Sequence, residues 1–217
     1  MSDTGFTISI TKEQLATLPI EEFDGQITVV ETLPAVSEAL MEIRHAGTVG
    51  FDTETKPSFR KGQLNKVSLM QVSTADHCYL FRINKTGLCP EIISFLEDPG
   101  VKKVGLSLKD DFLVLHRLAQ FEPAGFIDLQ ETVREFTITD ASLQKIYAII
   151  FNRRISKSQR LSNWEAPVLT VSQQSYASID AWACLRIHSA LTSHKFNPDL
   201  SPYKITVKPE SEEETPA

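Results

Sequence analysis

The spacing of apolar and polar residues changes several times along the chain, and each change marks another predicted strand or helix. Short apolar runs rich in β-branched residues predict strands, and apolar residues at spacings of three and four predict helices. The predicted strands are residues 27–30, 48–53, 67–73, 78–82, 103–106 and 125–129. The predicted helices are residues 33–44, 91–96, 108–119, 130–135, 142–151 and 172–193.

The order of these elements indicates the fold class. Strands come first in a meander, and later strands alternate with helices, which predicts an α/β fold with a mixed sheet of about five strands flanked by helices. Residues 1–26 are expected to form an N-terminal extension, with a short helix after Thr11 because residues 11–14 resemble a capping box. Residues 195–217 are rich in Pro and Glu, so we expect a largely disordered tail.

Composition limits the classes of protein that fit. The chain has 217 residues, 41% hydrophobic and 23% charged, which suits one globular domain. Its longest purely apolar run, Ile146–Phe151, is too short to span a membrane, and the N-terminus lacks the basic and apolar regions of a secretory signal. Three scattered cysteines favour neither a disulfide framework nor a zinc site. We therefore expect an intracellular, cytoplasmic protein with no membrane partner.

Two carboxylates close the predicted strand 48–53. Asp52 and Glu54 are two residues apart, so both side chains point to the same face where the strand ends. Neighbouring carboxylates repel each other unless a cation lies between them. An isolated D-x-E is more often the solvated start of a loop, so this motif alone does not identify a site.

A phenol and a carboxylate share one face of the last predicted helix. Tyr176 and Asp180 are four residues apart, about one turn, and their apolar neighbours indicate that much of this helix is buried. Buried polar groups need a partner. The alternative is a tyrosine with a local hydrogen bond and an aspartate at the surface.

Two adjacent aspartates begin the helix predicted from residue 108. Ser107 could cap this helix, and both aspartates could simply favour its dipole. Leu108 and Leu115 lie on the apolar face, and Asp111 falls on that face while Asp110 falls on a more outward flank. The periodicity therefore selects Asp111 as the inward carboxylate.

Together these three segments resemble the DEDD superfamily of exonucleases, subclass y, within the ribonuclease H-like fold. Its signature is D-x-E on a first strand, a later aspartate at a strand-to-helix junction, and Y-x-x-x-D on a late helix. The chain is most similar to the Werner-syndrome-type exonuclease domain and more distantly to RNase D. The flanking matches are residues 51–54, 60–67, 78–81, 103–105 and 161–164, so the resemblance predicts an exonuclease domain over residues 27–194.

The resemblance implies a metal-dependent 3′–5′ exonuclease that hydrolyses phosphodiester bonds and releases nucleoside 5′-monophosphates. It implies two divalent ions, Mg²⁺ or Mn²⁺, bound by Asp52, Glu54, Asp111 and Asp180, with no nucleotide cofactor. By the same resemblance Tyr176 orients the attacking water. A phenol with an ordinary pKa near 10 suits that orienting role better than the role of a strong base.

A second group of residues is expected to meet the nucleic acid. Lys157 and Arg160 precede the last helix in a region where the family carries basic residues, although solvated surface charge explains them equally well. Arg60 and Lys61 could contact the same backbone. Trp164 could stack on a terminal base, but an aromatic residue at this place more often packs into the core.

A net charge of −6 is unfavourable for an enzyme that binds a polyanion, but the net negative charge arises in the last ten residues and in the candidate metal ligands. The last ten residues contribute −3, and the four candidate metal ligands contribute −4. With two divalent ions bound, the remainder of the chain carries +1. We therefore expect a locally basic groove and weak nonspecific binding.

Two further alternatives stay open on the sequence. The substrate could be the 3′ end of DNA or of RNA, because nothing in the chain shows which sugar is recognised. The chain could also be a nucleic-acid-binding or scaffold protein that keeps the fold without turnover, although such relatives usually lose a metal ligand. RNase D carries further helical domains after its nuclease, and Werner-type proteins carry a helicase. The residues after 191 are too few for either domain, so we expect a stand-alone nuclease domain.

Overall fold

A computed structural model describes residues 5–57 and 66–206. The strands are β1 (Phe6–Ile8), β2 (Gln26–Val30), β3 (Thr48–Thr55), β4 (Val67–Ser73), β5 (His77–Phe81), β6 (Lys102–Gly105), β7 (Phe126–Asp128) and β8 (Lys204–Thr206). The α-helices are α1 (Lys12–Thr17), α2 (Leu33–Ala46), α3 (Ile83–Thr86), α4 (Pro90–Leu96), α5 (Leu108–Leu115), α6 (Leu129–Thr132), α7 (Leu143–Phe151) and α8 (Val171–Thr192), with 3₁₀ turns η1 (Val133–Phe136) and η2 (Pro198–Leu200).

The main sheet has the strand order β2-β5-β4-β3-β6-β7. Strands β3, β4 and β5 form an antiparallel meander, whereas β2, β6 and β7 add to it in parallel pairs. The α/β class and the mixed sheet expected from the sequence are confirmed. The sheet has six strands rather than about five, because both β2 and β7 pair as edge strands.

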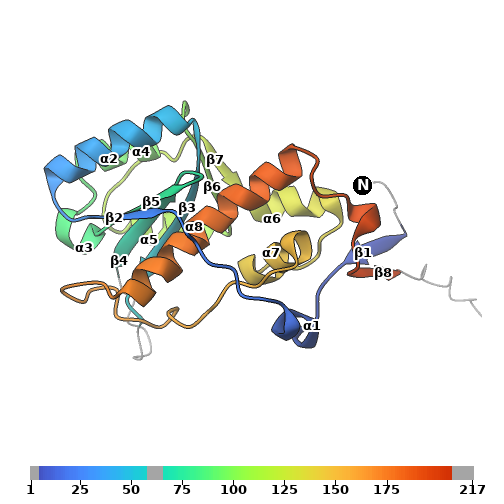
Figure 1. Cartoon of the computed structure of the whole chain (residues 1–217). Coiled ribbons are helices and arrows are strands. Elements are labelled where there is room, and N and C mark those ends of the chain that lie inside the picture. The colour runs from blue at the N-terminus through green and yellow to red at the C-terminus, as the bar shows by residue number, and fades with distance from the viewer. Residues whose placement is uncertain (1–4, 58–65, 207–217) are drawn as a thin grey trace, which may run out of the picture.

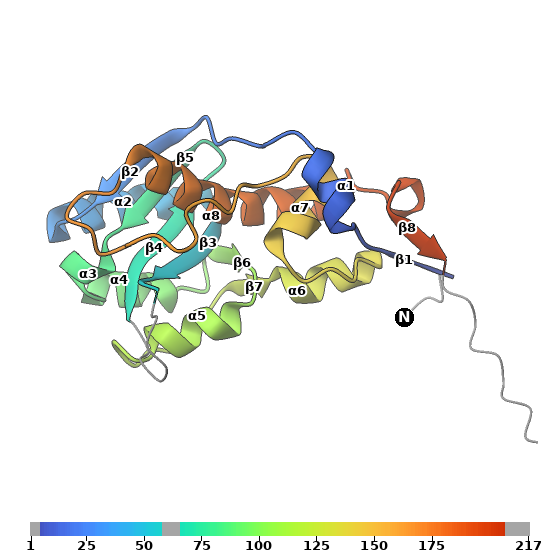
Figure 2. The ribbon, with the colours of Figure 1, turned by 90° about the horizontal axis from the view of Figure 1, so that it is seen from below.

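Helices cover both faces of this sheet, as Figures 1 and 2 show. Side chains alternate between the faces along β3, so Phe51 joins the core shared with α2, α4 and α5. The opposite face is covered by α7 and by α8, which runs along the sheet as its longest described helix. Thr170 begins α8 with a capping box. The site described below lies where α8 passes β3.

The two ends of the described chain lie side by side. Strand β8 pairs antiparallel with β1, from Phe6↔Thr206 to Ile8↔Lys204, and the capping box at Thr11 predicted for α1 is present. The prediction of a disordered tail is therefore wrong for residues 195–206, where η2 and β8 form ordered structure. Proline marks the start of η2 rather than a break in order. None of the described helices is long and apolar enough to cross a membrane.

Most element boundaries differ from the sequence prediction by a few residues, and two further differences concern the α-helices. Helix α5 ends at Leu115, four residues before the predicted end. The short helix α3 was missed because its four residues contain too little periodic pattern to detect. Neither difference moves a candidate site residue to another element.

Candidate active site

Three carboxylates meet at the end of β3. Asp52 and Glu54 come from that strand, Asp180 comes from α8, and one oxygen from each lies within 4.8 Å of the others. The two-residue spacing on a strand and the four-residue spacing of Tyr176 and Asp180 on a helix produce this convergence. The sequence prediction that these residues share one place agrees with the geometry.

A glycine brings the helix close enough to the strand. A Cβ atom added to Gly50 would lie 1.8 Å from the carbonyl oxygen of Ala181, the residue after Asp180. Any side chain at position 50 would therefore push α8 away from β3. Gly50 lies on the same face as Asp52, so the absence of its side chain helps to set the distance between Asp52 and Asp180.

The fourth carboxylate reaches the site from the other side of the sheet. Asp111 is 8% exposed on α5, and the Thr53 hydroxyl donates a hydrogen bond of 2.5 Å to its Oδ1. The neighbouring Asp110 is exposed. The predicted inward direction of Asp111 and outward direction of Asp110 are confirmed.

The start of α5 is held by a residue that sequence reasoning missed. Ser107 has a left-handed backbone (φ 60°) and its side chain does not cap the helix, so the capping role suggested for it is wrong. Asp128 instead accepts hydrogen bonds from the backbone N–H groups of Ser107 (3.2 Å), Leu108 (2.9 Å) and Gln130 (2.9 Å). One carboxylate thus caps both α5 and α6. No local sequence pattern reveals this capping, because Asp128 is twenty residues away.

Burial and mutual repulsion make the four carboxylates hard to ionise together. Burial and then Asp52 and Asp180 raise the pKa of Glu54 to about 9. Burial raises the pKa of Asp180 to about 7, although Tyr176 and Lys157 lower it. The pKa values of Asp52 and Asp111 lie well above their ordinary range, through burial and then through Asp180 and Asp52 respectively.

Among the described residues, no Lys, Arg or His lies within ion-pair distance of these four carboxylates. A set of hard oxygen donors in this situation fits divalent cations such as Mg²⁺ or Mn²⁺. The three tightly grouped carboxylates could hold one ion. Asp52 also raises the pKa of Asp111, and Asp111 raises that of Glu54, so the fourth carboxylate interacts with the group of three.

Tyr176 closes the site on the helix side. Its side chain is 8% exposed, and burial followed by the charges of Asp180 and Glu54 raises the pKa of its hydroxyl above the ordinary value. The hydroxyl therefore stays protonated at neutral pH. It can donate or accept a hydrogen bond, and its deprotonated form, which could act as a base, is scarcer than in a solvated tyrosine.

Two of the predicted basic residues lie beside the carboxylates. Lys157 lines a hollow of about 160 Å³ together with Asp52, Asp180 and Tyr176. Its charge lowers the pKa of Asp180, and the charge of Arg160 lowers that of Glu54. Both side chains are exposed, so they remain open to an incoming anion.

The remaining predicted substrate residues have other outcomes. Trp164 is completely buried beside Tyr176, with ring centroids 6.0 Å apart, so no face of its ring is open to a base. The stacking role proposed for it is corrected to a core role, because the loop before α8 folds over the sheet. Arg60 and Lys61 lie outside the described residues.

Comparison with known proteins gives one family match. Residues 27–194 match the family described as 3′-5′ exonuclease. The chain is 29% identical to the bifunctional 3′-5′ exonuclease/ATP-dependent helicase WRN of Mus musculus, over 80% of this chain and 13% of that protein. The chain spans between 13% and 66% of the length of the curated relatives it matches.

Solved structures share the fold. The Nibbler EXO domain of Aedes aegypti has a TM-score of 0.71 and 20% identity, covering 82% of this chain and 96% of that one. Escherichia coli RNase D, an exoribonuclease involved in structured RNA processing, has a TM-score of 0.70 and 20% identity, covering 77% of this chain and 44% of that one. These likenesses confirm the ribonuclease H-like fold expected from the sequence.

Proposed function

The chain belongs to the 3′–5′ exonuclease family, and from that premise we propose that it hydrolyses phosphodiester bonds at nucleic-acid 3′ ends and releases nucleoside 5′-monophosphates. The observation that carries this proposal is the group formed by Asp52, Glu54 and Asp180 within 4.8 Å, with Asp111 beside Asp52. A scaffold protein without turnover would not need to keep four mutually repelling carboxylates. We therefore favour an enzyme.

Asp52, Glu54, Asp111 and Asp180 would hold two divalent ions, Mg²⁺ or Mn²⁺. When bound, such ions lower the pKa of water and stabilise the charge that develops on the departing oxygen. The carboxylates supply the negative charge that attracts the ions, and their fixed positions on β3, α5 and α8 limit how far apart the ions lie. Thr53 keeps Asp111 in place through its hydrogen bond.

Tyr176 would orient the attacking water through its hydroxyl, which burial keeps protonated. Lys157 and Arg160 would contact the phosphates, since both are exposed beside the carboxylates. With the carboxylates neutralised by metal, these two basic residues would give the site a local positive charge that the net charge of the chain does not reveal. The domain responsible would be residues 27–194.

A degradation assay with 5′-labelled oligonucleotides tests the proposal. We expect stepwise shortening from the 3′ end with Mn²⁺ or Mg²⁺, none in EDTA, and nucleoside 5′-monophosphates as products. Matched single-stranded DNA, recessed-end duplex DNA and RNA would show which substrate is preferred. Binding without shortening, with either metal and on every substrate, would support the scaffold alternative instead.

A further inference from the structure

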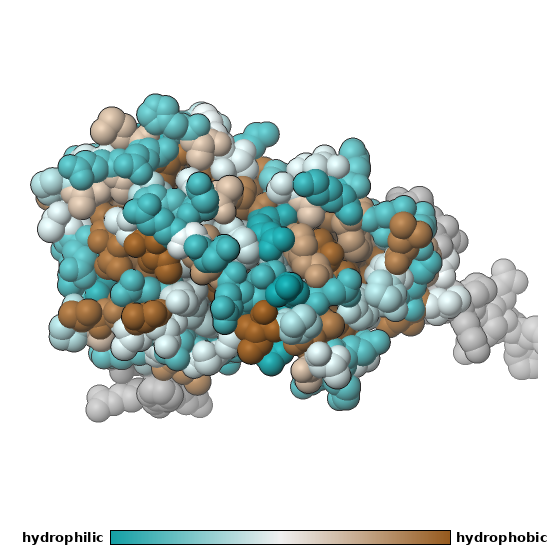
Figure 3. All heavy atoms as spheres, in the orientation of Figure 1, coloured by the Kyte–Doolittle hydropathy of each residue, from teal (hydrophilic) through white to brown (hydrophobic). Residues whose placement is uncertain are grey.

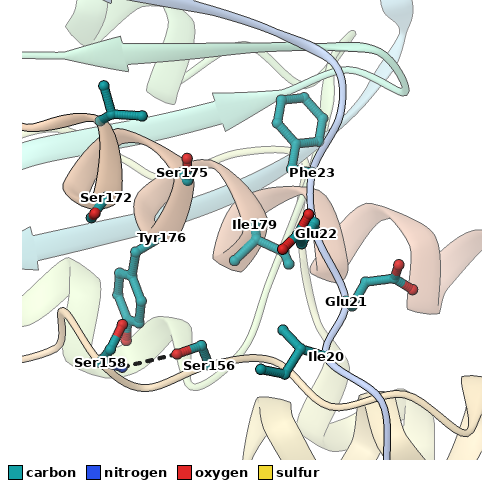
Figure 4. A pocket seen from close by; sticks show the side chains of 11 residues that line it. Ile20, Glu21, Glu22, Phe23, Ser156, Ser158, Ser172, Ser175, Tyr176 and Ile179 are labelled. Carbon is teal, nitrogen blue, oxygen red and sulfur yellow. Dashed lines mark hydrogen bonds between the residues drawn. The ribbon is translucent and has the colours of Figure 1, made fainter.

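The loop between α7 and α8 carries Lys157 and Arg160 and is built from successive turns. In Figure 4 its residues Ser156 and Ser158 lie beside Tyr176. Four backbone hydrogen bonds overlap along the loop: Arg160 N–H donates to Lys157 O (3.3 Å), Ser162 to Gln159 (2.9 Å), Trp164 to Ser162 (3.1 Å) and Ala166 to Asn163 (3.1 Å). Because each turn shares residues with the next, the place of the two basic residues depends on where the end of the loop near Ala166 is fixed.

Apolar contacts fix this loop at two points along its second half. Trp164 and Leu169 are buried, at 0% and 3% exposure. Residues 165–168 between them are half-buried or exposed, and Val168 is 77% exposed. In Figure 3 apolar residues reach the surface where Figure 1 draws this loop and the start of α8. The segment 165–168 is therefore placed by its polar contacts rather than by burial.

Two cations at the start of α3 hold this segment by its backbone carbonyls. The Arg82 guanidinium donates to Ala166 O at 2.5 Å, and the Lys85 ammonium donates to Pro167 O at 3.1 Å. Glu31 binds both cations, with Arg82 Nη1 at 3.2 Å and Lys85 Nζ at 2.6 Å. Such bonds are stronger than neutral ones because the donor is charged. We call Glu31, Arg82 and Lys85 the loop clamp.

Arg82 is directed at the loop and not at the carboxylates. It is 0% exposed, and Asn84 and Glu31 hold two of its nitrogens while Nη2 meets Ala166. Strand β5, which ends just before Arg82, lies two places from β3 in the sheet, a distance of roughly 10 Å. The clamp therefore acts on the site through the loop.

The opposite end of the loop carries the charges proposed to meet the substrate. Lys157 lines the hollow that contains Asp52 and Asp180, and the charge of Arg160 acts on Glu54. Both cations are exposed, and the attraction between a cation and a phosphate falls with distance. A displaced loop would therefore bind a phosphate at the carboxylates less tightly.

We propose that Arg82 and Lys85 are positioning residues, which hold the loop so that Lys157 and Arg160 lie where the phosphates of the nucleic acid pass. The inference rests on the proposed exonuclease function. Without the clamp the loop takes several positions, and the substrate binds only to the fraction of molecules whose loop is correctly placed. The chemical step stays intact, because the carboxylates and Tyr176 lie on β3, α5 and α8 rather than on the loop.

Steady-state hydrolysis of a 5′-labelled single-stranded oligonucleotide with Mn²⁺ measures the effect. Arg82→Met should raise KM about tenfold and Lys85→Met about threefold, with kcat within about twofold of the wild type, because binding is lost and not transition-state stabilisation. Arg82→Lys should recover part of the loss, since lysine still donates to a carbonyl. Lys85 is partly exposed, so Lys85→Met keeps the test open if Arg82→Met does not fold. Arg44→Met is the matched control, because Arg44 is a partly exposed cation paired with Asp98 after α4, and its KM should equal that of the wild type.

Two readouts separate positioning of the loop from a general effect on the fold. The slope of log KM against log salt concentration should fall by about 0.7–1.4 in Arg82→Met, because each lost phosphate contact removes about 0.7 on a single strand. In a chain that already carries Lys157→Ala and Arg160→Ala, Arg82→Met should raise KM less than about twofold, because its effect acts through those two residues.

Unchanged KM in both Arg82→Met and Lys85→Met would overturn the inference, as would a full rise of KM in the chain that lacks Lys157 and Arg160. No hydrolysis by the wild type would refute the proposed function instead, and amide hydrogen exchange then decides on the clamp. Exchange over residues 157–167 should be faster in Arg82→Met and Lys85→Met than in the wild type, and equal exchange would overturn the inference as well.

Discussion

Two acidic sites in this molecule differ in whether the chain supplies the opposite charge: the site of Glu21 and the group of four carboxylates on β3, α5 and α8. Glu21 is 13% exposed at the side chain, and the chain supplies its partners: Tyr147 donates at 2.8 Å, Arg186 lies at 3.2 Å and Arg153 at 3.8 Å. The guanidinium of Arg186 is held in turn over the ring of Phe151, at 4.5 Å from its centroid. This acid is neutralised within the fold.

The carboxylates on β3, α5 and α8 have no such cations within ion-pair distance among the described residues. Because burial raises the pKa values of Glu54 and Asp180, both residues keep their protons at pH values where carboxylic acids in water are ionised. The comparison separates a structural acid, Glu21, whose counter-charges are supplied by the chain itself, from the four carboxylates that we propose bind cations from solution. Four changes test that distinction.

The largest effect is expected for Asp52→Asn. Asp52 belongs to the group of three carboxylates and also interacts with Asp111, so its loss should lower the rate of 3′-end hydrolysis by at least about 10³-fold, on the scale of a lost electrostatic group in an active site. The melting temperature in EDTA should not fall, because the substitution removes a repelling charge. Measurement of both quantities on one preparation is decisive: a large fall in stability together with activity would assign Asp52 a structural role.

The adjacent aspartates on α5 should differ strongly. Asp111→Asn should reduce hydrolysis by about 10²-fold or more, whereas Asp110→Asn should change it less than about twofold, because Asp110 is exposed. Titration of Mn²⁺ by electron paramagnetic resonance should show weaker binding only in Asp111→Asn. The reverse pattern in the two variants would show that the exposed aspartate is the ligand.

Glu21→Ala should affect stability and leave turnover largely intact. The change leaves the hydroxyl of Tyr147 and the guanidinium of Arg186 without their acceptor, which should lower the free energy of unfolding by about 1–3 kcal/mol. Urea denaturation measures the loss, and kcat with Mn²⁺ measures activity per folded molecule. A loss of activity without a loss of stability would move Glu21 into the group of functional acids.

The smallest effect is a dependence of stability on pH in the metal-free protein. The pKa of Glu54 rises from 4.5 to about 9 and that of Asp180 from 3.8 to about 7 on folding. Groups with a raised folded pKa stabilise the fold fully below their unfolded pKa, and this stabilisation is lost as pH rises through the folded value. We therefore expect the free energy of unfolding in EDTA to fall by about 1–3 kcal/mol between pH 5 and 9, a loss limited by coupling between the groups.

Saturating Mg²⁺ should remove most of this decline, because a bound cation compensates the ionised carboxylates. Thermal melts across the pH range, with EDTA and with Mg²⁺, provide the measurement. Identical pH profiles under the two conditions would contradict the proposal that these carboxylates bind a divalent cation. The Glu21→Ala variant should show the same metal dependence as the wild type, since its charge network lies elsewhere.

Periodicity predicted the directions of the candidate site residues because each lies in a regular element, and the resemblance to the exonucleases selected them as a set. The alternation of β3 placed Asp52 and Glu54 together, and the helical repeat placed Asp111 inward and Tyr176 one turn from Asp180. A side chain that follows a strand or helix repeat can be oriented before the fold is known. The directions of the four carboxylates and the α/β class were therefore predicted from the sequence, while the role of these carboxylates as metal ligands stays a prediction.

Contacts between distant segments could not be found in this way. Gly50 is required because α8 passes within contact of β3, and Asp128 caps a helix that begins twenty residues earlier. The sequence left both a stacking role and a core role open for Trp164, and only the folded loop before α8, which buries its ring, decides for the core. Each of these features depends on which distant segments come into contact, and the local spacing of apolar residues carries no information about such contacts.

The pairing of β1 with β8 has a consequence for the order in which the molecule can assemble. Residue 6 is synthesised before its partner, residue 206, and roughly 200 residues separate them, a long sequence separation for a strand pair. By then every strand of the six-stranded sheet and the whole of α8 have already been translated. The small sheet can therefore form only after the element that carries Asp180 has been synthesised, and the chain can bring its acids together before β1 and β8 pair.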